Sequence, residues 1–219
     1  MYLSRLLLDP RHKQARTDLA NPYQMHATLC WAFRKAERPA EGESEERGRT
    51  VEPFLWRLEE GKTPIVLVQS AGQPNWDKLT ERFPGYLQSS SEYKPLPLEH
   101  LQPGQVLRFR LRANPTVTRK DPQNPQKSKR HGLKEVEEQL EWLSRQGRKG
   151  GFAVLGAMVA QSERVKMFKH TGGSPIVLQS VLYEGHLRIT DLEAFKNTLT
   201  GGLGHAKALG FGLLSIARG

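Results

Sequence analysis

A chain of 219 residues is long enough to bury a hydrophobic core, and it can hold one large domain or two small ones. Its 33 Lys and Arg residues outnumber its 23 Asp and Glu residues, so the formal net charge is +10. This charge favours a polyanionic partner, with nucleic acid before an anionic membrane surface. The one cysteine, Cys30, excludes an internal disulfide and a multi-cysteine zinc site, and we expect a cytoplasmic protein.

The N-terminal part of the chain predicts a strand followed by a capped helix. Residues 1–10 predict a first strand and then a polar turn through Arg16, and neither this apolar run nor any other is long enough for a signal peptide or a membrane span. Asn21-Pro22 predicts a helix start, because Asn is a good N-cap and Pro fits the first helical position. Tyr23 and His26 are three residues apart, so we expect both on one face of this helix.

The rest of the first half predicts a loop, two strands, a helix and a linker. Residues 37–50 are charged and turn-rich, which indicates a mobile surface loop. Strands are expected over residues 54–58 and 64–69, and a helix over residues 76–83, with room for a fourth strand before Leu98. Closely spaced prolines mark residues 95–104 as a linker.

Beyond the linker the same order of elements is predicted again. Residues 105–112 alternate between apolar and basic, so a strand here would present Arg108, Arg110 and Arg112 on one face. Helices are expected over residues 133–146 and 190–199, and strands over residues 152–160, 164–169, 175–182, 186–189 and 211–217. The chain therefore fits an α+β protein with two tandem β-α-β-β-α-β domains, over residues 1–94 and 105–219, and one larger α+β domain is the competing interpretation. Folds of this kind commonly present a sheet face to RNA.

Positive charge is concentrated in two places in the second half. Residues 108–130 hold eight Lys or Arg residues and one acid, Asp121, and the Pro- and Gln-rich part from Asn114 to His131 is typical of a flexible basic loop. A second basic segment, predicted as a hairpin with its turn at residues 171–174, carries Arg164, Lys166 and Lys169. Contact with a phosphate backbone is the functional interpretation of both segments, and solvated basic loops without a partner are the alternative.

The C-terminal segment is dense in glycine, with Gly201, Gly202, Gly204, Gly210 and Gly212 inside twelve residues. Glycine loses the most backbone freedom on ordering, so this density predicts a loop. Such a loop lets backbone N–H groups approach a phosphate, and Lys207 adds a positive charge. A glycine-rich turn before the last strand is the alternative. The segment lacks the Ser or Thr that follows the P-loop lysine and contains no G-x-G-x-x-G, so a phosphate other than that of ATP or NAD is favoured.

Several of these segments together resemble the CasE family, the CRISPR RNA processing endoribonucleases of the multi-subunit complex called Cascade. The resemblance spans nearly the whole chain and rests on six stretches in the same order, residues 2–4, 23–26, 66–70, 109–115, 181–185 and 202–215. The family implies two ferredoxin-like (RRM-like) domains and metal-independent cleavage of repeat RNA on the 3′ side of its hairpin, with no cofactor. It also implies three kinds of partner, namely the repeat hairpin RNA, the mature CRISPR RNA and other Cascade subunits. It implies no membrane partner.

The resemblance also assigns candidate site residues. The family's active-site histidine falls on His26 and its tyrosine on Tyr23, while its loop glycines and lysine fall on Gly202, Gly204, Gly210, Gly212 and Lys207. In the family, the segment with Arg164 and Lys166 lies against the RNA stem. Three positions depart from the pattern: His205 replaces a usual proline, and Ala27 and Trp31 stand where some members carry basic residues.

The chemistry expected of these residues is transfer of a phosphodiester to the RNA's own 2′-OH. This reaction needs a proton acceptor, a proton donor and stabilisation of an anionic phosphorane, but no nucleophilic side chain. His26, with an unperturbed pKa of about 6.5, can accept or donate a proton near neutrality. Tyr23, with an unperturbed pKa of about 10, suits a hydrogen-bonding or acid role better than a base. The alternatives are an RNA-hairpin-binding protein without catalysis and, third, a metal-dependent nuclease.

Overall fold

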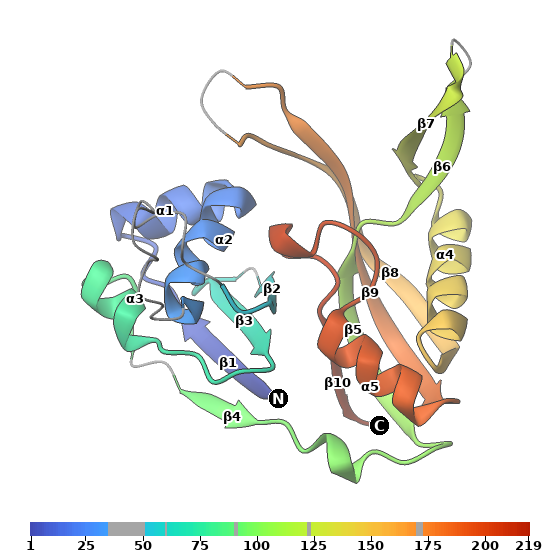
Figure 1. Ribbon diagram of the computed structural model, residues 1–219, viewed down its shortest axis with the longest axis horizontal. Helices are drawn as coiled ribbons and strands as arrows, with labels where there is room; N and C mark the ends of the chain where they lie inside the picture. The colour runs from blue at the N-terminus through green and yellow to red at the C-terminus, as the bar shows by residue number, and fades with distance from the viewer. Residues whose placement is uncertain (35–50, 60, 90–91, 122–123, 170–172) are drawn as a thin grey trace, which may run out of the picture. The chain divides into compact units, whose positions relative to one another are not determined.

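The structure is a computed structural model that describes residues 1–34, 51–59, 61–89, 92–121, 124–169 and 173–219. The loop predicted over residues 37–50 lies outside the described residues. The chain divides into two compact units, Met1–Pro97 and Leu98–Gly219 (Figure 1). Both units combine helices with an antiparallel sheet, so the chain is an α+β protein as predicted. No helix within the described ranges is long and apolar enough to cross a membrane.

The first unit is a four-stranded antiparallel sheet in the order β2-β3-β1-β4. Its elements are β1 (Tyr2–Leu7), α1 (Lys13–Ala20), α2 (Pro22–Leu29), the 3-10 helix η1 (Cys30–Phe33), β2 (Phe54–Glu59), β3 (Ile65–Ser70), α3 (Asp77–Arg82) and β4 (Tyr93–Pro95). The predicted polar turn through Arg16 is wrong, because α1 occupies these residues. Ala15 and Asp18 are buried on this short helix, so tertiary packing rather than a strong apolar pattern holds it.

One face of this sheet packs under the helices. Alternate residues on the central strands, such as Leu6 on β1 and Val66 and Val68 on β3, point into the core and are fully or almost fully buried. Met25 and Leu29 of α2 belong to the same core. This apolar contact holds α2 against the sheet.

The second unit is a four-stranded antiparallel sheet in the order β10-β5-β9-β8, with a separate two-stranded hairpin, β6–β7. Its elements are the 3-10 helix η2 (Leu98–His100), β5 (Val106–Ala113), β6 (Thr116–Asp121), β7 (Asn124–Gly132), α4 (Val136–Lys149), β8 (Phe152–Met167), β9 (Ile176–Ile189), α5 (Leu192–Gly201), the 3-10 helix η3 (Lys207–Leu209) and β10 (Leu214–Arg218). The segments expected as separate strands over residues 152–160 and 164–169 form one long strand, β8. It accommodates two register irregularities, between Val154 and Gly156 and between Val159 and Gln161.

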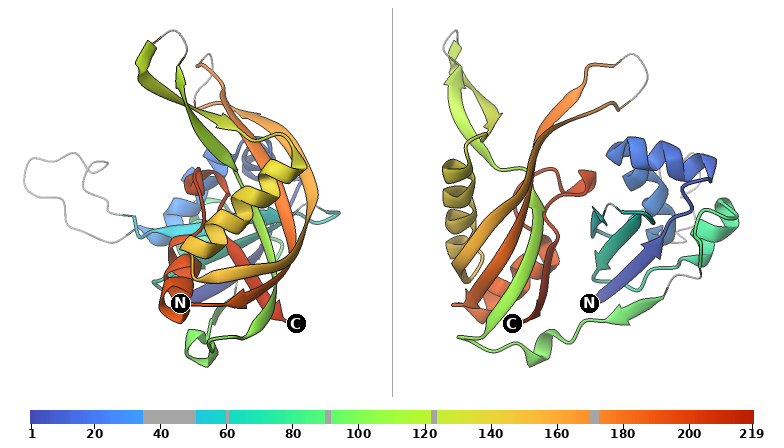
Figure 2. Two further views of the ribbon diagram at one scale, coloured as in Figure 1. Left: turned by 90° about the vertical axis from the view of Figure 1, so that its right-hand side faces the viewer. Right: turned by 180° about the vertical axis from the view of Figure 1, so that it is seen from behind.

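The flexible loop expected from Asn114 to His131 is also wrong, because most of it is the paired hairpin β6–β7. The predicted alternation along β5 is correct: Leu107, Phe109 and Leu111 are buried, and the arginines between them point to the other face. Helices α4 and α5 cover the buried face (Figure 2), where the ring of Trp142 stacks 6.3 Å from that of Tyr183. The arginine-bearing face is therefore the side of the sheet away from the helices.

Candidate active site and basic surfaces

The helix α2 begins as the sequence predicts, and this places Tyr23 and His26. The side-chain Oδ1 of Asn21 accepts a hydrogen bond of 3.1 Å from the backbone N–H of Tyr23, and Pro22 occupies the first helical position. Tyr23 and His26 then lie about one turn apart on α2, and both side chains are half-buried. The two predicted catalytic side chains therefore come from one rigid element.

His26 sits in an aromatic environment that favours the neutral imidazole. Its ring stacks on Phe54 with centroids 5.0 Å apart and an interplanar angle of 27°, and Phe54 in turn stacks on Phe33 at 4.4 Å. Burial lowers the pKa of His26 below its ordinary value of 6.5. Its Nδ1 atom is buried and has no hydrogen-bond partner among the described residues. The lowered pKa favours the neutral imidazole, and the position of the ring depends on its packing against Phe54.

Sequence reasoning missed Phe54 and the polar cluster beneath α2. Asp18 is 1% exposed, and its carboxylate accepts hydrogen bonds from the Tyr86 hydroxyl at 2.8 Å and from Gln14 Nε2 at 2.9 Å. The same Gln14 amide donates to Thr28 Oγ1 on α2 at 3.3 Å. Burial raises the pKa of Asp18 although these hydrogen bonds oppose the shift. The cluster ties α1 to α2 two residues beyond His26, so it helps to orient the helix that carries His26.

The departures at Ala27 and Trp31 change where positive charge lies near this helix. Ala27 is exposed, and the Trp31 ring carries the guanidinium of Arg34 at 3.5 Å from its centroid and that of Arg82 at 5.1 Å. Arg34 is the only Lys or Arg from residue 22 to residue 34. Positive charge therefore lies on the Trp31 ring, although Trp31 itself is neutral.

The glycine-rich segment forms the predicted loop, between α5 and β10, and the closing strand starts at Leu214 rather than Phe211. Two of its glycines are required by close packing. A Cβ atom at Gly204 would lie 3.0 Å from the Trp142 ring, and one at Gly212 would lie 2.6 Å from the Leu203 carbonyl oxygen. Both also have positive φ, as do Gly202 and Gly210. Packing and backbone conformation therefore account for these glycines without a ligand.

A different part of the same loop has the geometry of an anion site. Within the described ranges, the backbone N–H groups of residues 204–207 have no hydrogen-bond acceptor. Gly204 and Ala206 have positive φ, whereas His205 and Lys207 do not, and alternation of this kind turns successive N–H groups toward one concavity. The Lys207 side chain starts at this concavity. The loop can therefore offer both N–H donors and positive charge to a phosphate.

The three arginines of β5 differ in what their side chains contact. Arg112 is 13% exposed, and its guanidinium donates to Ser180 Oγ at 3.1 Å and to Gln161 Oε1 at 3.3 Å, so it ties β5 to β9 and β8. Arg110 forms an ion pair of 3.3 Å with Glu184, and Arg108 Nε donates to the Arg218 carbonyl oxygen at 3.0 Å. Arg108 and Arg110 are exposed, so they face solvent from the sheet surface while Arg112 braces it.

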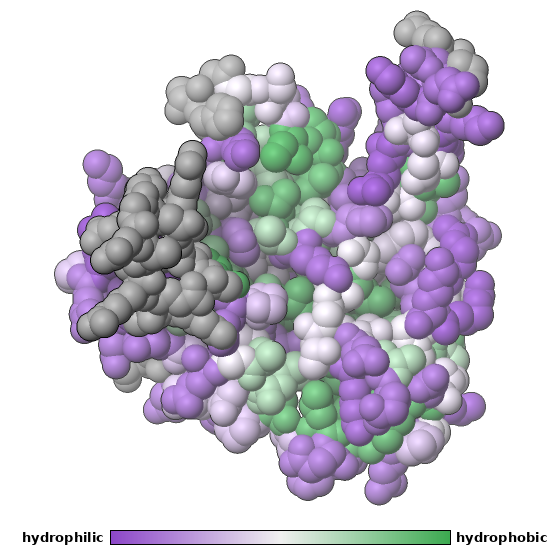
Figure 3. All heavy atoms as spheres, viewed as in Figure 1, coloured by the Kyte–Doolittle hydropathy of each residue, from purple (hydrophilic) through white to green (hydrophobic). Residues whose placement is uncertain are grey.

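The basic residues of the second predicted segment lie toward the far end of β8. Arg164 and Lys166 are exposed on one face of the β8–β9 hairpin, and Lys169 is exposed just after β8 ends. The other hairpin, β6–β7, extends beyond the sheet and is covered by hydrophilic side chains (Figure 3). Unit 2 therefore carries two basic hairpins, of which the sequence predicted one as a hairpin and the other as a loop.

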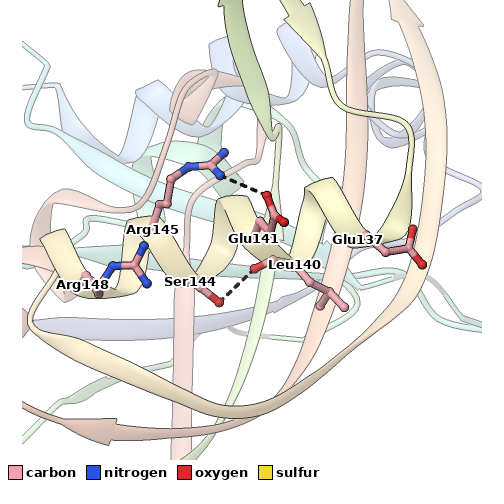
Figure 4. Close-up of a pocket in the computed structure, with 6 residues that line it drawn as sticks. All are labelled: Glu137, Leu140, Glu141, Ser144, Arg145 and Arg148. Atoms are coloured by element: carbon pink, nitrogen blue, oxygen red, sulfur yellow. Dashed lines mark hydrogen bonds and ion pairs between the residues drawn. The ribbon is translucent and has the colours of Figure 1, made fainter.

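A shallow hollow of about 390 Å³ along the outer side of α4 is a weaker candidate (Figure 4). It is lined by Glu137, Leu140, Glu141, Ser144, Arg145 and Arg148. The Arg145 guanidinium is paired with Glu141 at 3.6 Å, and Ser144 Oγ donates to the Leu140 carbonyl oxygen at 3.1 Å. Both signs of charge are present and partly neutralise each other, so the hollow does not attract a polyanion. Among the described residues no group of three or more His, Cys, Asp or Glu side chains is placed to hold a metal ion.

The comparisons with known proteins agree on one family. A family model described as "CRISPR associated protein" matches residues 1–218. The chain is 40% identical to the "CRISPR-associated endoribonuclease Cse3" of Thermus thermophilus, over 99% of this chain and 100% of that protein. It is 33% identical to the "CRISPR system Cascade subunit CasE" of Escherichia coli, over 99% of each chain. A solved structure of "CRISPR endoribonuclease Cse3 bound to 19 nt RNA" is similar with a TM-score of 0.79 and 39% identity, over 100% of both chains.

Proposed function

This chain belongs to the CRISPR associated protein family as a CasE-type member, and from that membership we propose that it is an endoribonuclease that cleaves CRISPR repeat RNA. The name of the Thermus thermophilus relative supports the activity, and the name of the Escherichia coli relative supports a place beside other Cascade subunits. The observation that carries the proposal is His26: a half-buried, neutral imidazole with an unpartnered Nδ1, about one helical turn from a tyrosine.

The proposed reaction uses the RNA's own nucleophile and no metal. The 2′-oxygen attacks the adjacent phosphorus, a 2′-O–P bond forms, and the P–O5′ bond breaks. The 2′-hydroxyl proton goes to a base and the leaving 5′-oxygen takes a proton, which leaves 2′,3′-cyclic phosphate and 5′-hydroxyl ends. Because its pKa is lowered, His26 suits the role of the base, and the Tyr23 hydroxyl suits hydrogen bonding to the phosphate or the leaving oxygen.

Arg34 is our candidate for the cation at the scissile phosphate. It is the only Lys or Arg between residues 22 and 34, and the Trp31 ring restricts its guanidinium. Replacing Arg34 by Gln should lower the cleavage rate without abolishing RNA binding, and Arg34→Lys should restore part of the rate, because the charge returns without the planar stacking. Equal rates for the wild type and Arg34→Gln would remove this assignment.

We further propose that each unit is a ferredoxin-like domain, over residues 1–94 and 105–219, joined by a linker over residues 95–104. Numbering the four sheet strands of each unit in chain order gives the same spatial order, 4-1-3-2, and the β6–β7 hairpin is then an insertion in the second domain. The RNA surfaces that we assign are the glycine loop with Lys207, the arginine-bearing sheet face with Arg108 and Arg110, and the exposed cations of β8. Arg112 lies on the same sheet face and ties its strands together.

The test is incubation of the protein with a repeat hairpin RNA in EDTA, with product ends identified chemically. We expect cleavage on the 3′ side of the hairpin, giving the cyclic phosphate. A single 2′-deoxy nucleotide on the 5′ side of the scissile bond should block cleavage and leave binding intact, because the nucleophile is removed. Binding without cleavage would make the protein a non-catalytic hairpin binder, and cleavage that stops in EDTA would refute the metal-free mechanism.

A further inference from the structure

Two arginines from different elements of the first unit share the ring of Trp31. Arg34 directly follows η1, and its guanidinium carbon lies 3.5 Å from the ring centroid. Arg82 is the last residue of α3, and its guanidinium carbon lies 5.1 Å from the same centroid and 6.0 Å from that of Phe83. Two positive charges held beside one ring repel each other. An anion bound between them would remove this repulsion.

The Arg82 side chain is available to such an anion. Arg82 is exposed, and within the described ranges no carboxylate pairs with it, although Asp77 and Glu81 belong to the same helix. A guanidinium that lies over an aromatic ring uses its face, whereas its N–H groups point outward from its edge. These N–H groups form a fork that matches the oxygens of a phosphate.

Other contacts than that of Arg82 attach α3 to η1. The backbone N–H of Asn75 donates to the Ala32 carbonyl oxygen at 2.9 Å, and Lys78 Nζ donates to the Arg34 carbonyl oxygen at 2.9 Å. Arg82 follows Lys78 by four residues, so both lie on the face of α3 that is turned toward η1. The hydrogen bonds therefore set where Arg82 reaches Trp31, and its charge is not needed to hold the helix.

A continuous set of packed rings connects this pair of arginines to the candidate active site. Phe33 lies between Trp31 and Arg34 in the chain, and it is buried and stacks on Phe54 at 4.4 Å. Phe54 in turn stacks on His26 at 5.0 Å. A phosphate bound by the arginines is therefore held at a defined position relative to the imidazole.

We propose that Arg82 is a further substrate-binding residue of the reaction, which contacts the phosphate that follows the scissile phosphate on its 3′ side. This proposal rests on the proposed function, in which Arg34 contacts the scissile phosphate. Attack by the 2′-oxygen requires the phosphorus and the leaving 5′-oxygen to be in line, so the strand on the leaving side must also be positioned. A contact to its phosphate positions this strand whatever its sequence.

The first test compares Arg82→Gln and Arg82→Lys with a matched control, Lys62→Gln. Lys62 is exposed in the turn after β2. Phe54, which stacks on His26, begins that strand, so Lys62 lies beyond its far end. The control removes the same charge from the same unit at a distance from the arginine pair. Single-turnover cleavage is measured at subsaturating protein, so that losses in binding and in positioning both count.

We expect Arg82→Gln to lower the cleavage rate by roughly 10-fold, the effect of losing one hydrogen bond to a charged group. Arg82→Lys should restore part of the rate, because the charge returns without the planar fork. Lys62→Gln should leave the rate nearly unchanged. Equal rates for the wild type and Arg82→Gln would overturn the proposal, and equal losses in Arg82→Gln and Lys62→Gln would replace it by a general effect of net charge.

The second test removes the charge of the RNA instead of that of the protein. The substrate carries a methylphosphonate in place of the phosphate that follows the scissile one. The nucleotide between the two phosphates is 2′-O-methylated in this RNA and in the charged reference RNA, so that only the charge differs. We expect the neutral linkage to slow the wild type about as much as Arg82→Gln does, and to slow Arg82→Gln little further, because both changes remove the same contact. A neutral linkage in the stem is the control, and its effect should multiply with that of Arg82→Gln.

The outcomes distinguish the proposed function from this contact. If the wild type cleaves no repeat RNA, the proposed function fails. If the wild type cleaves, but Arg82→Gln and the neutral linkage multiply their effects, the proposed function stands and the contact is wrong. Urea unfolding of Arg82→Gln tests a purely structural role: a lower stability, together with equal slowing of the charged and neutral RNAs, would make Arg82 a fastener of α3 and overturn the proposal.

Discussion

Replacing Asp18 by Ala should destabilise the first unit and disturb α2, the helix that carries His26. In the native structure the Asp18 carboxylate accepts hydrogen bonds from the fully buried Tyr86 and from Gln14. The substitution leaves both donors without this acceptor, at about 1–3 kcal/mol each, and part of the loss is offset because a buried carboxylate no longer has to be desolvated. We therefore expect a loss of roughly 2–4 kcal/mol, a large fraction of the stability of an ordinary domain.

Asp18→Asn is the matched control, because it keeps the shape and can still hydrogen-bond with Tyr86 and Gln14. Since the pKa of Asp18 is raised, the folded state binds more protons than the unfolded state at pH values from about 3.8 up to the raised pKa. The protonated side chain therefore contributes stability below pH 3.8, and this contribution disappears as pH rises through the folded pKa. Asp18→Asn should consequently gain stability relative to the wild type as pH increases.

Urea unfolding of the wild type and both variants, at acid and neutral pH, measures these differences. The tryptophan fluorescence of the first unit and the far-UV signal should be followed together, because a chain of two units can unfold in more than one step. Cleavage should fall in Asp18→Ala even where the protein is folded, because Thr28 loses the cluster that orients α2. An Asp18→Ala protein as stable as the wild type, or one with a fully active His26, would refute the reasoning.

Three other predictions follow from the same helix and from the hairpin base. His26→Ala should lower single-turnover cleavage by at least about 100-fold with hairpin affinity unchanged, because the proton-transfer group is lost; Tyr23→Phe should cost less, and a parallel loss of affinity would make His26 structural. The cleavage rate should rise with pH through a pKa below 6.5. Protein stability should fall as pH decreases from 6.5 through that pKa, because the unfolded state binds the proton more readily. In urea titrations, His26→Gln should flatten this change in stability. Gly132→Ala should weaken RNA binding without any change in charge, because the new Cβ displaces the β6–β7 hairpin from Gln179; binding equal to that of the wild type would show that the hairpin's position is unimportant.

Local signals were sufficient to predict the start of α2 and the arginine-bearing sheet face. Asn21 and Pro22 act within one turn of the chain, so the start of α2 is readable without tertiary information. The alternation along β5 likewise belongs to one strand, and it correctly placed Arg108 and Arg110 on the open face. In both cases the deciding interactions lie between near neighbours in sequence or with solvent.

Features that depend on distant partners were not readable from the sequence. His26 stacks on Phe54, which is 28 positions further along the chain, and no sequence pattern around either residue predicts this contact. The β6–β7 hairpin lacks the apolar alternation by which strands are usually recognised, because neither of its faces is in a core. Strand β8 was divided in two because its register irregularities interrupt the period-two pattern.

The attachment of the β6–β7 base beside Gln179 also bears on how such a protein can diverge. Because the hairpin contributes no side chain to the core, insertions, deletions and charge changes near its tip leave the packing of the sheet and helices untouched. Selection can therefore alter its length and charge while Asn114, Gly132 and Gln179 keep the base in place. Exchanging the segment between Thr116 and Gly132 among relatives would accordingly test whether this hairpin contributes to RNA binding, with the core of the second unit left as it is.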